Sequence, residues 1–127
     1  MKTDLGARGE YMACRFLREE KGMEFIRANY STRDGEIDLI LIDGDMLVFA
    51  EVKTRSLPGA VRHGRGAEKI DGEKREKIQK AARQFLREEK DLCRGKRYRF
   101  DAVEIYTDPA DPLLVRVIHT PFAFGNY

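Results

Sequence analysis

Apolar residues recur at the spacing of an amphipathic helix in two stretches of the chain. The first stretch predicts a helix over residues 4–21, which Gly22 would end. The second predicts a helix over residues 71–90, where charged residues fill the positions outside the apolar stripe. Each predicted helix therefore has one face to bury and one face for solvent.

Five shorter stretches have the β-branched, aromatic and aliphatic content of strands. We predict strands over residues 24–30, 36–42, 47–54, 97–106 and 113–118. Between the second and third of these, Asp43-Gly44-Asp45 predicts a tight hairpin. Residues 108–112 predict a turn, because their two prolines would interrupt ladder hydrogen bonds. Residues 121–127 predict an aromatic tail that packs on the sheet.

The remaining segments connect these elements. Residues 55–69 are basic, contain three glycines and lack periodicity, so we predict a mobile surface loop, and residues 90–96 predict a short connection. The order of one helix, three strands, one helix and two strands predicts an α/β fold, with a mixed central sheet and helices on both faces. A chain of 127 residues fits a single core, so we expect one domain over residues 1–127.

Two of the predicted strands carry charged residues inside otherwise apolar sequence. Asp38 lies in Gly35-Glu36-Ile37-Asp38-Leu39-Ile40, and Glu51 and Lys53 lie in Phe49-Ala50-Glu51-Val52-Lys53-Thr54. Burying charges in a sheet is unfavourable unless they are paired or bind a metal. These three residues are therefore candidates for a site that carries chemistry.

The register of the predicted hairpin decides which of these side chains meet, because alternate residues of a strand point to opposite faces. With a loop of Gly44-Asp45, Asp38 lies directly opposite Glu51. With a loop of Asp43-Gly44, Asp38 lies opposite Phe49, and Glu51 is its diagonal neighbour. In both registers the two carboxylates share a face, and directly opposed Cβ atoms lie about 4.5–5.5 Å apart. A three-residue loop would separate the carboxylates unless a bulge restored the pairing.

Two carboxylates beside a lysine suit metal-dependent hydrolysis of a phosphodiester. Mg²⁺ favours one or two carboxylates together with water and phosphate oxygens, so Asp38 and Glu51 could hold Mg²⁺ or Mn²⁺, with the Val52 carbonyl as a further ligand. Lys53 could orient or deprotonate the attacking water, or balance the charge on the phosphate. Glu10 sits at the margin of the apolar stripe of the first helix, where it could bind a second metal or hold a metal-bound water.

Composition changes this picture little. The chain has 24 Lys+Arg and 22 Asp+Glu, and a net charge of +2 does not by itself indicate a polyanionic partner. The longest apolar run, residues 39–42, is too short to cross a membrane, and the N-terminal sequence does not resemble a signal peptide, so we expect a cytoplasmic protein. Cys14 and Cys93 are too few for a disulfide framework, and we interpret both as ordinary reduced thiols.

Four blocks of the sequence resemble those of the bacterial YraN family of nuclease-like proteins. They are Gly9-Glu10, Gly35-Glu36-Ile37-Asp38-Leu39-Ile40, Phe49-Ala50-Glu51-Val52-Lys53-Thr54-Arg55 and Arg99-Phe100-Asp101. The order of an acidic helix residue, an Asp and a Glu-x-Lys is also similar to that of archaeal Holliday-junction resolvases. Both groups belong to the restriction-endonuclease-like, PD-(D/E)XK superfamily, so the resemblance implies a restriction-endonuclease-like fold.

The resemblance also implies an activity, namely metal-dependent endonucleolytic cleavage of DNA, with branched or otherwise structured DNA as a candidate substrate. It implies Glu10, Asp38 and Glu51 as acidic members of the active site and Lys53 as the catalytic lysine. Asp38 and Glu51 are the expected metal ligands, and a homodimer would suit a two-fold symmetric junction. Lys74 corresponds to a basic position of the family. The residues expected to contact nucleic acid are Arg33, Arg55, Lys74 and Lys77.

Plainer interpretations stand beside this one. The charged strand residues could form a solvated face whose exposed ion pairs contribute about 0.2–1 kcal/mol each, although Ile40 and Phe49 on the same faces count against it. The chain could also be a non-catalytic nucleic-acid-binding module of the same fold that acts through a partner. DNA binding that ignores Mg²⁺ would favour this module. A protein-interaction domain is a third alternative, and it would show no salt-dependent retention on DNA.

Overall fold

The five strands form one mixed sheet whose order in space follows their order in the chain, β1-β2-β3-β4-β5. The computed structural model describes residues 4–56 and 72–125. Its elements are α1 (Asp4–Glu19), β1 (Glu24–Ser31), β2 (Glu36–Asp43), β3 (Met46–Ser56), α3 (Gly72–Glu88), α4 (Lys90–Cys93), β4 (Arg97–Asp108) and β5 (Asp111–Phe124). Only the β3–β4 pair is parallel, and parallel neighbours need a crossover, which α3 belongs to.

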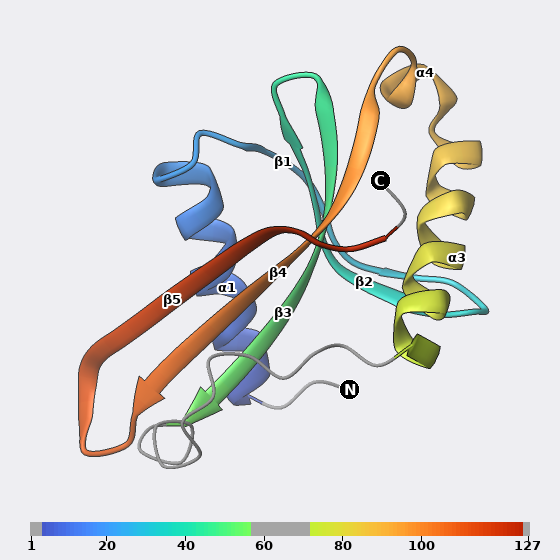
Figure 1. Ribbon diagram of the computed structural model, residues 1–127. Helices are drawn as coiled ribbons and strands as arrows, with labels where there is room; N and C mark the ends of the chain where they lie inside the picture. The colour runs from blue at the N-terminus through green and yellow to red at the C-terminus, as the bar shows by residue number, and fades with distance from the viewer. Residues whose placement is uncertain (1–3, 57–71, 126–127) are drawn as a thin grey trace.

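The two long helices lie on opposite faces of the sheet, as Figure 1 shows. On the α1 face, Leu17 packs with Leu39 and Val48, and all three are essentially inaccessible to solvent. On the α3 face, the ring of Phe85 meets that of Phe49 edge to face at a centroid distance of 6.0 Å. Because β2 and β3 have a helix on each side, they are apolar on both faces, unlike a half-exposed strand.

The predicted fold class is confirmed: the structure has a mixed central sheet with helices on both faces. The predicted elements are present, with the helices ending two residues earlier than expected, at Glu19 and Glu88. Within the described residues, no helix has both the length and the apolar character that a transmembrane segment needs. The start of the second predicted helix at residue 71 lies outside the described residues.

Three boundary predictions were wrong. Residues 55 and 56 belong to β3 and not to the predicted loop, because their backbone continues the parallel ladder with β4; residues 57–69 lie outside the described residues. The predicted connection of residues 90–96 contains the short helix α4. The predicted turn over residues 108–112 and the predicted tail over residues 121–127 both overlap β5, which contains Pro112 and Pro121. β5 is an edge strand, and an edge tolerates residues without an N–H donor.

The predicted aromatic tail is in part the end of this edge strand. β5 extends to Phe124, whose ring stacks on that of Phe100 at a centroid distance of 5.0 Å. Residues 126–127 lie outside the described residues. Phe124 therefore packs on the α3 face of the sheet, as the sequence predicted, whereas Phe122 is 49% exposed.

The strands β2 and β3 diverge midway along the sheet, and Figure 1 shows their ends running in different directions. Their ladder ends at the pair Leu39 and Ala50, whereas β2 stays paired with β1 as far as Glu36 and β3 stays paired with β4 as far as Ser56. Gly35 precedes the diverging end of β2, and a Cβ atom there would lie 2.8 Å from the Lys77 carbonyl oxygen. The glycine therefore lets α3 sit directly against the split.

Candidate active site

The split in the sheet places Asp38 and Glu51 next to each other. Asp43 pairs with Met46, so the hairpin loop is Gly44-Asp45. The last ladder pair is Leu39 and Ala50, and the next residue on each strand is Asp38 and Glu51, which therefore lie opposite each other. The loop has glycine at its first position with a φ of 62°, which is the requirement of a type II′ turn. Of the two registers considered above, the structure has the one that opposes the carboxylates directly.

Both carboxylates are buried, each with 6% of the residue surface exposed. The backbone N–H of Val52 donates to Asp38 Oδ2 at 2.8 Å, at the point where the strand ladder has ended. The Asp38 carboxylate thus accepts a hydrogen bond that, in a continuous ladder, a backbone carbonyl of the neighbouring strand would accept. This bond fixes the side chain on the α3 side, beside Glu51.

A cavity of about 440 Å³ lies over the two carboxylates, between the split strands and α3. Its lining residues are Gly35, Glu36, Asp38, Glu51, Val52, Lys74, Lys77 and Ile78. Acidic groups form the floor and two lysines of α3 form one wall. A cavity of this volume has room for a phosphate group together with water.

Lys74, in the first turn of α3, contacts the floor of this cavity. Its Nζ lies 2.6 Å from Glu51 Oε1, and its side chain is 41% exposed whereas that of Glu51 is 7% exposed. Burial disfavours the ammonium form of Lys74, but the contact with Glu51 outweighs this and raises the pKa of the lysine. Lys74 was predicted to contact a phosphate of nucleic acid, and in this structure its ammonium group contacts the Glu51 carboxylate.

The electrostatics of Glu51 reflect its crowded surroundings. Burial and the negative charge of Asp38 raise the pKa of Glu51 to about 7, and the Lys74 ammonium offsets only part of this effect. Burial and the Asp38 charge therefore outweigh the attraction of the Lys74 ammonium for the ionised form of Glu51. Perturbations of this size concentrate at functional sites.

Lys53 lies two residues beyond Glu51 on the same face of β3 and is partly buried. Burial and the positive charge of Lys74 lower the pKa of Lys53, and the charge of Glu51 opposes this shift. A lowered pKa brings an amine closer to serving as a proton acceptor at neutral pH. The structure therefore brings together four of the predicted site residues: Asp38, Glu51, Lys53 and Lys74.

Glu10 lies in a neighbouring cavity and does not join the carboxylate pair. This second cavity, of about 600 Å³, lies between α1, β1 and β2. Glu10 is 9% exposed, and with the Asn29 amide turned so that its nitrogen faces the carboxylates, that nitrogen lies 3.1 Å from Glu10 Oε1 and 3.2 Å from Glu36 Oε1. Over residues 4–56 and 72–125, no three His, Cys, Asp or Glu side chains are grouped closely enough to hold one metal ion.

Sequence reasoning missed Asn29 and Glu36. Asn29 has a φ of 53°, a left-handed conformation that asparagine tolerates better than most residues, and its amide lies between two acidic side chains from different elements. Glu36 lines both cavities and so connects Glu10 with the Asp38 side of the split. The one signal in the sequence was an asparagine inside an apparent strand, which is unfavourable there.

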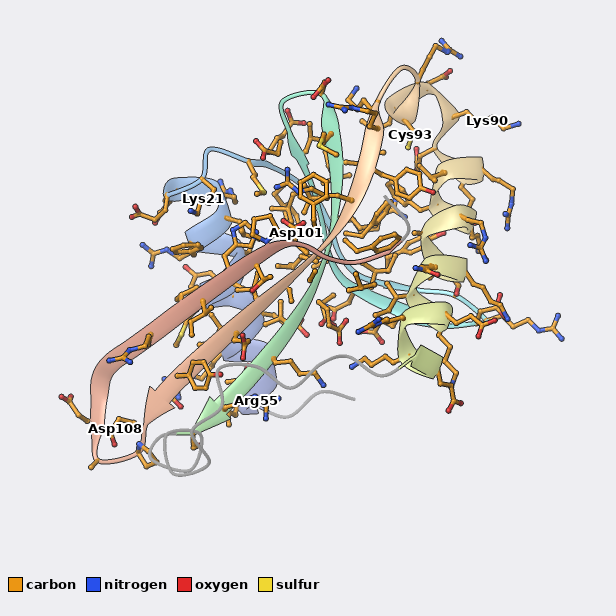
Figure 2. All side chains as sticks on the ribbon, viewed as in Figure 1. Lys21, Arg55, Lys90, Cys93, Asp101 and Asp108 are labelled. Atoms are coloured by element: carbon orange, nitrogen blue, oxygen red, sulfur yellow. The ribbon has the colours of Figure 1, made fainter. Side chains whose placement is uncertain are left out.

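Of the other predicted nucleic-acid contacts, Lys77 lines the cavity, whereas Arg33 and Arg55 do not. Lys77 lines the same cavity as Lys74, is exposed, and lies 3.5 Å from Glu73 one turn before it. Arg33 is exposed in the turn before β2. Arg55 lies near the end of β3, away from α3, as Figure 2 shows. Their roles toward nucleic acid stay predictions.

A second cluster of buried charges lies on the opposite, α1 face. Asp101 is fully buried, and its carboxylate accepts hydrogen bonds from Arg99 Nε at 2.9 Å and from the Phe122 N–H at 3.2 Å, and lies 2.8 Å from His119 Nε2 (Figure 2 labels Asp101). Burial opposes ionisation of Asp101, but contacts with His119 and Arg99 outweigh it and lower its pKa. This cluster joins the irregular end of β5 to β4 and is structural.

The two cysteines take no part in the site. Cys14 and Cys93 are free thiols, and burial raises the pKa of each above its ordinary value. A raised pKa leaves less of the reactive thiolate at neutral pH. Both cysteines agree with the interpretation of ordinary reduced thiols.

Known proteins of one family are similar to this chain over most of its length. The model of the family described as "Uncharacterised protein family UPF0102" matches residues 9–105, which include all of the sequence blocks that resemble the YraN family. The UPF0102 protein of Rhodococcus opacus is 46% identical over 101 residues, which are 80% of each chain. That of Caldanaerobacter subterraneus subsp. tengcongensis is 35% identical over 125 residues, 97% of this chain and 96% of the other.

Proposed function

We propose, starting from the fact that this chain belongs to the UPF0102 (YraN) family, that it is a metal-dependent endonuclease that hydrolyses phosphodiester bonds in DNA. The observation that carries the proposal is the buried pair Asp38 and Glu51, opposed where β2 and β3 part and covered by a cavity with lysines in its wall. Buried carboxylates without such a purpose would weaken the sheet.

The residues of the site fit a divalent cation of the Mg²⁺ or Mn²⁺ type. Asp38 and Glu51 offer hard oxygen ligands, and such ions need only one or two carboxylates when water and phosphate oxygens complete the shell. The pKa of Glu51 is raised to about 7 by burial and by the neighbouring Asp38, and a cation bound between the two carboxylates would favour the ionised form. A bound cation would supply Lewis acidity toward a phosphoryl oxygen of the substrate.

The lysines around the pair have separable tasks in this proposal. Lys53, whose pKa is lowered by burial and by Lys74, orients the attacking water and accepts its proton. Lys77, exposed at the wall of the cavity, contacts a phosphate of the substrate backbone. Arg33 and Arg55 extend this contact along the backbone, which would make binding salt-dependent.

The similarity to archaeal Holliday-junction resolvases supports branched or otherwise structured DNA as the substrate, and supports a homodimer that would act on both sides of a junction. A comparison of four-way junctions, forks and linear duplexes of the same sequence tests this substrate class. A junction should be cleaved faster than the duplex. Equal rates on both would contradict the substrate class and leave the hydrolytic proposal standing.

The activity itself is tested with single-residue variants in Mg²⁺. Asp38→Asn and Glu51→Gln should each lower the cleavage rate by at least about 100-fold while leaving the fold intact, because each removes a ligand charge. Asp91→Asn is the matched control, since the Asp91 side chain is 93% exposed in the short helix α4. Cleavage that survives in both site variants would refute the proposal. DNA binding that is unchanged by Mg²⁺, without cleavage, would favour the non-catalytic module instead.

A further inference from the structure

We propose that the ammonium group of Lys74 stands in for the divalent cation when no metal is bound, so that metal binding requires Lys74 to leave Glu51. This inference rests on the proposed function in one respect, since it takes Asp38 and Glu51 as the metal ligands. It adds a competitor inside the site itself. It also predicts how substrate and metal depend on each other.

The contact of Lys74 differs from those of the other lysines on α3. Lys77 and Lys80 each lie beside an exposed glutamate one turn earlier on the same helix, at 3.5 and 4.0 Å. Lys74 instead reaches across to β3 and lies 2.6 Å from Glu51, whose side chain is 7% exposed. Surface pairs within a helix contribute little, whereas a buried carboxylate left without a partner is strongly unfavourable. The Lys74 contact is therefore the one that matters for the charge of the site.

When Glu51 is ionised, the four charged groups at the carboxylate pair balance without a metal. Asp38 and Glu51 contribute two negative charges, and Lys53 and Lys74 contribute two positive charges close to them. A divalent cation added to this set would bring an excess of two positive charges into a partly buried space. The excess is relieved when one ammonium moves away, and Lys74 directly occupies a carboxylate oxygen that the cation needs.

Of the two lysines, Lys74 is the one that can move. Lys53 is held in the middle of β3, whose backbone stays paired with β4 on both sides of it. Lys74 is at the first turn of α3, and its side chain is 41% exposed, so its ammonium can turn toward solvent or toward a ligand in the cavity. A phosphate of the substrate would offer the displaced ammonium a new partner. Metal and DNA should therefore bind cooperatively, with Lys74 passing from Glu51 to the phosphate.

The experiment is a titration of the protein with Mn²⁺, followed by the electron paramagnetic resonance of free Mn²⁺, at pH 8, which is above the pKa of about 7 of Glu51. Lys74→Gln should bind Mn²⁺ about tenfold more tightly than the wild type when DNA is absent, because a competing charge a few ångströms away has been removed. Lys74→Arg should behave like the wild type. Lys80→Gln is the matched control, since Lys80 lies beside the exposed Glu76 on the same helix, and the Mn²⁺ affinity of this variant should not change.

A second titration repeats the Mn²⁺ measurement in the presence of a short DNA duplex. It uses the Lys53→Met variant, in which cleavage is slowed and both carboxylates are retained. DNA should raise the Mn²⁺ affinity of this protein, and the gain should disappear when Lys74→Gln is added. Equal Mn²⁺ affinity of wild type and Lys74→Gln would overturn the inference alone, provided that Asp38→Asn weakens binding. Equal Mn²⁺ affinity in all variants, Asp38→Asn and Glu51→Gln included, would overturn the metal assignment as well. Failure of the Lys74 inference is therefore distinguishable from failure of the proposed metal site.

Discussion

The backbone N–H of Val52 donates a hydrogen bond to the carboxylate of Asp38, at 2.8 Å, where the ladder between their strands has ended. A side chain thus satisfies a donor that the parting of β2 and β3 leaves without a backbone partner in that ladder. The same parting makes room for the cavity over Asp38 and Glu51. Local backbone geometry and the candidate site therefore have one origin, the divergence of two central strands.

The raised pKa of Glu51 makes the stability of the metal-free protein depend on pH. Between about pH 4.5 and 7, the folded protein holds a proton on Glu51 that the unfolded chain has lost, so the free energy of unfolding should fall as pH rises through this window. Glu51→Gln should remove that part of the fall, whereas Glu76→Gln, at a side chain that is 68% exposed, should retain it. Urea unfolding at pH 5, 6, 7 and 8 measures this, and parallel curves for wild type and Glu51→Gln would contradict it.

Lys53→Met should separate chemistry from binding. Loss of a group that positions and deprotonates water typically lowers a rate about 100-fold to 10,000-fold, so we expect a fall in kcat within this range. The affinity for DNA should change little, because Lys53 is partly buried beside Glu51 and Lys74. Lys80→Met is the control, since Lys80 pairs with Glu76 on the surface of α3. Single-turnover cleavage and a binding assay in parallel check the two parts, and an unchanged kcat would remove Lys53 from the mechanism.

Gly35→Ala should destabilise the protein by about 1–3 kcal/mol, the usual range for overpacking. A Cβ atom at this position would lie 2.8 Å from the Lys77 carbonyl oxygen, so α3 would have to move away from the split. Gly72→Ala is the control, because a Cβ atom there meets no heavy atom within 4 Å. Thermal unfolding of both variants measures the difference. Equal stability would show that α3 does not press on β2 at this point.

Asp101→Asn should cost about 3 kcal/mol of stability, because it removes the charge at the centre of a buried network while Arg99 stays buried. The pKa of Asp101 is lowered in the folded state, so its stabilisation is present above pH 3.8 and is lost as pH falls below that value. Asp91→Asn, at an exposed position, should be neutral. Near-wild-type stability of Asp101→Asn at pH 7 would contradict the structural role of the cluster.

Much of the fold could be predicted because its elements have strong local patterns. The apolar stripes of both helices and the apolar runs of β2 and β3 each bury a face, and the family resemblance is confirmed by the match over residues 9–105. The hairpin register was left open between two loops, because Gly44 belongs to both; the pairing of Asp43 with Met46 decides it. The α/β class followed from the order of elements alone.

The candidate site could be predicted only in part. Strand parity brought Asp38 and Glu51 to one face, but no pattern in the sequence indicates that β2 and β3 part there. The helical charge run did not reveal that Lys74 reaches Glu51, because most charges of such a run face solvent. The position of Glu10 beside Asn29 depends on a left-handed backbone at residue 29, which tertiary packing sets and local sequence does not.

In the proposed mechanism, Asp38 and Glu51 together hold a divalent cation. A crystal of the protein soaked in Mn²⁺ and measured for anomalous scattering tests it most directly, because the signal locates the ion independently of any activity. We expect a single strong peak between the two carboxylates, with the Lys74 ammonium turned away from Glu51. A peak held by Glu10 and Glu36 in the other cavity, or none near Asp38, would show that this pair is not the metal site.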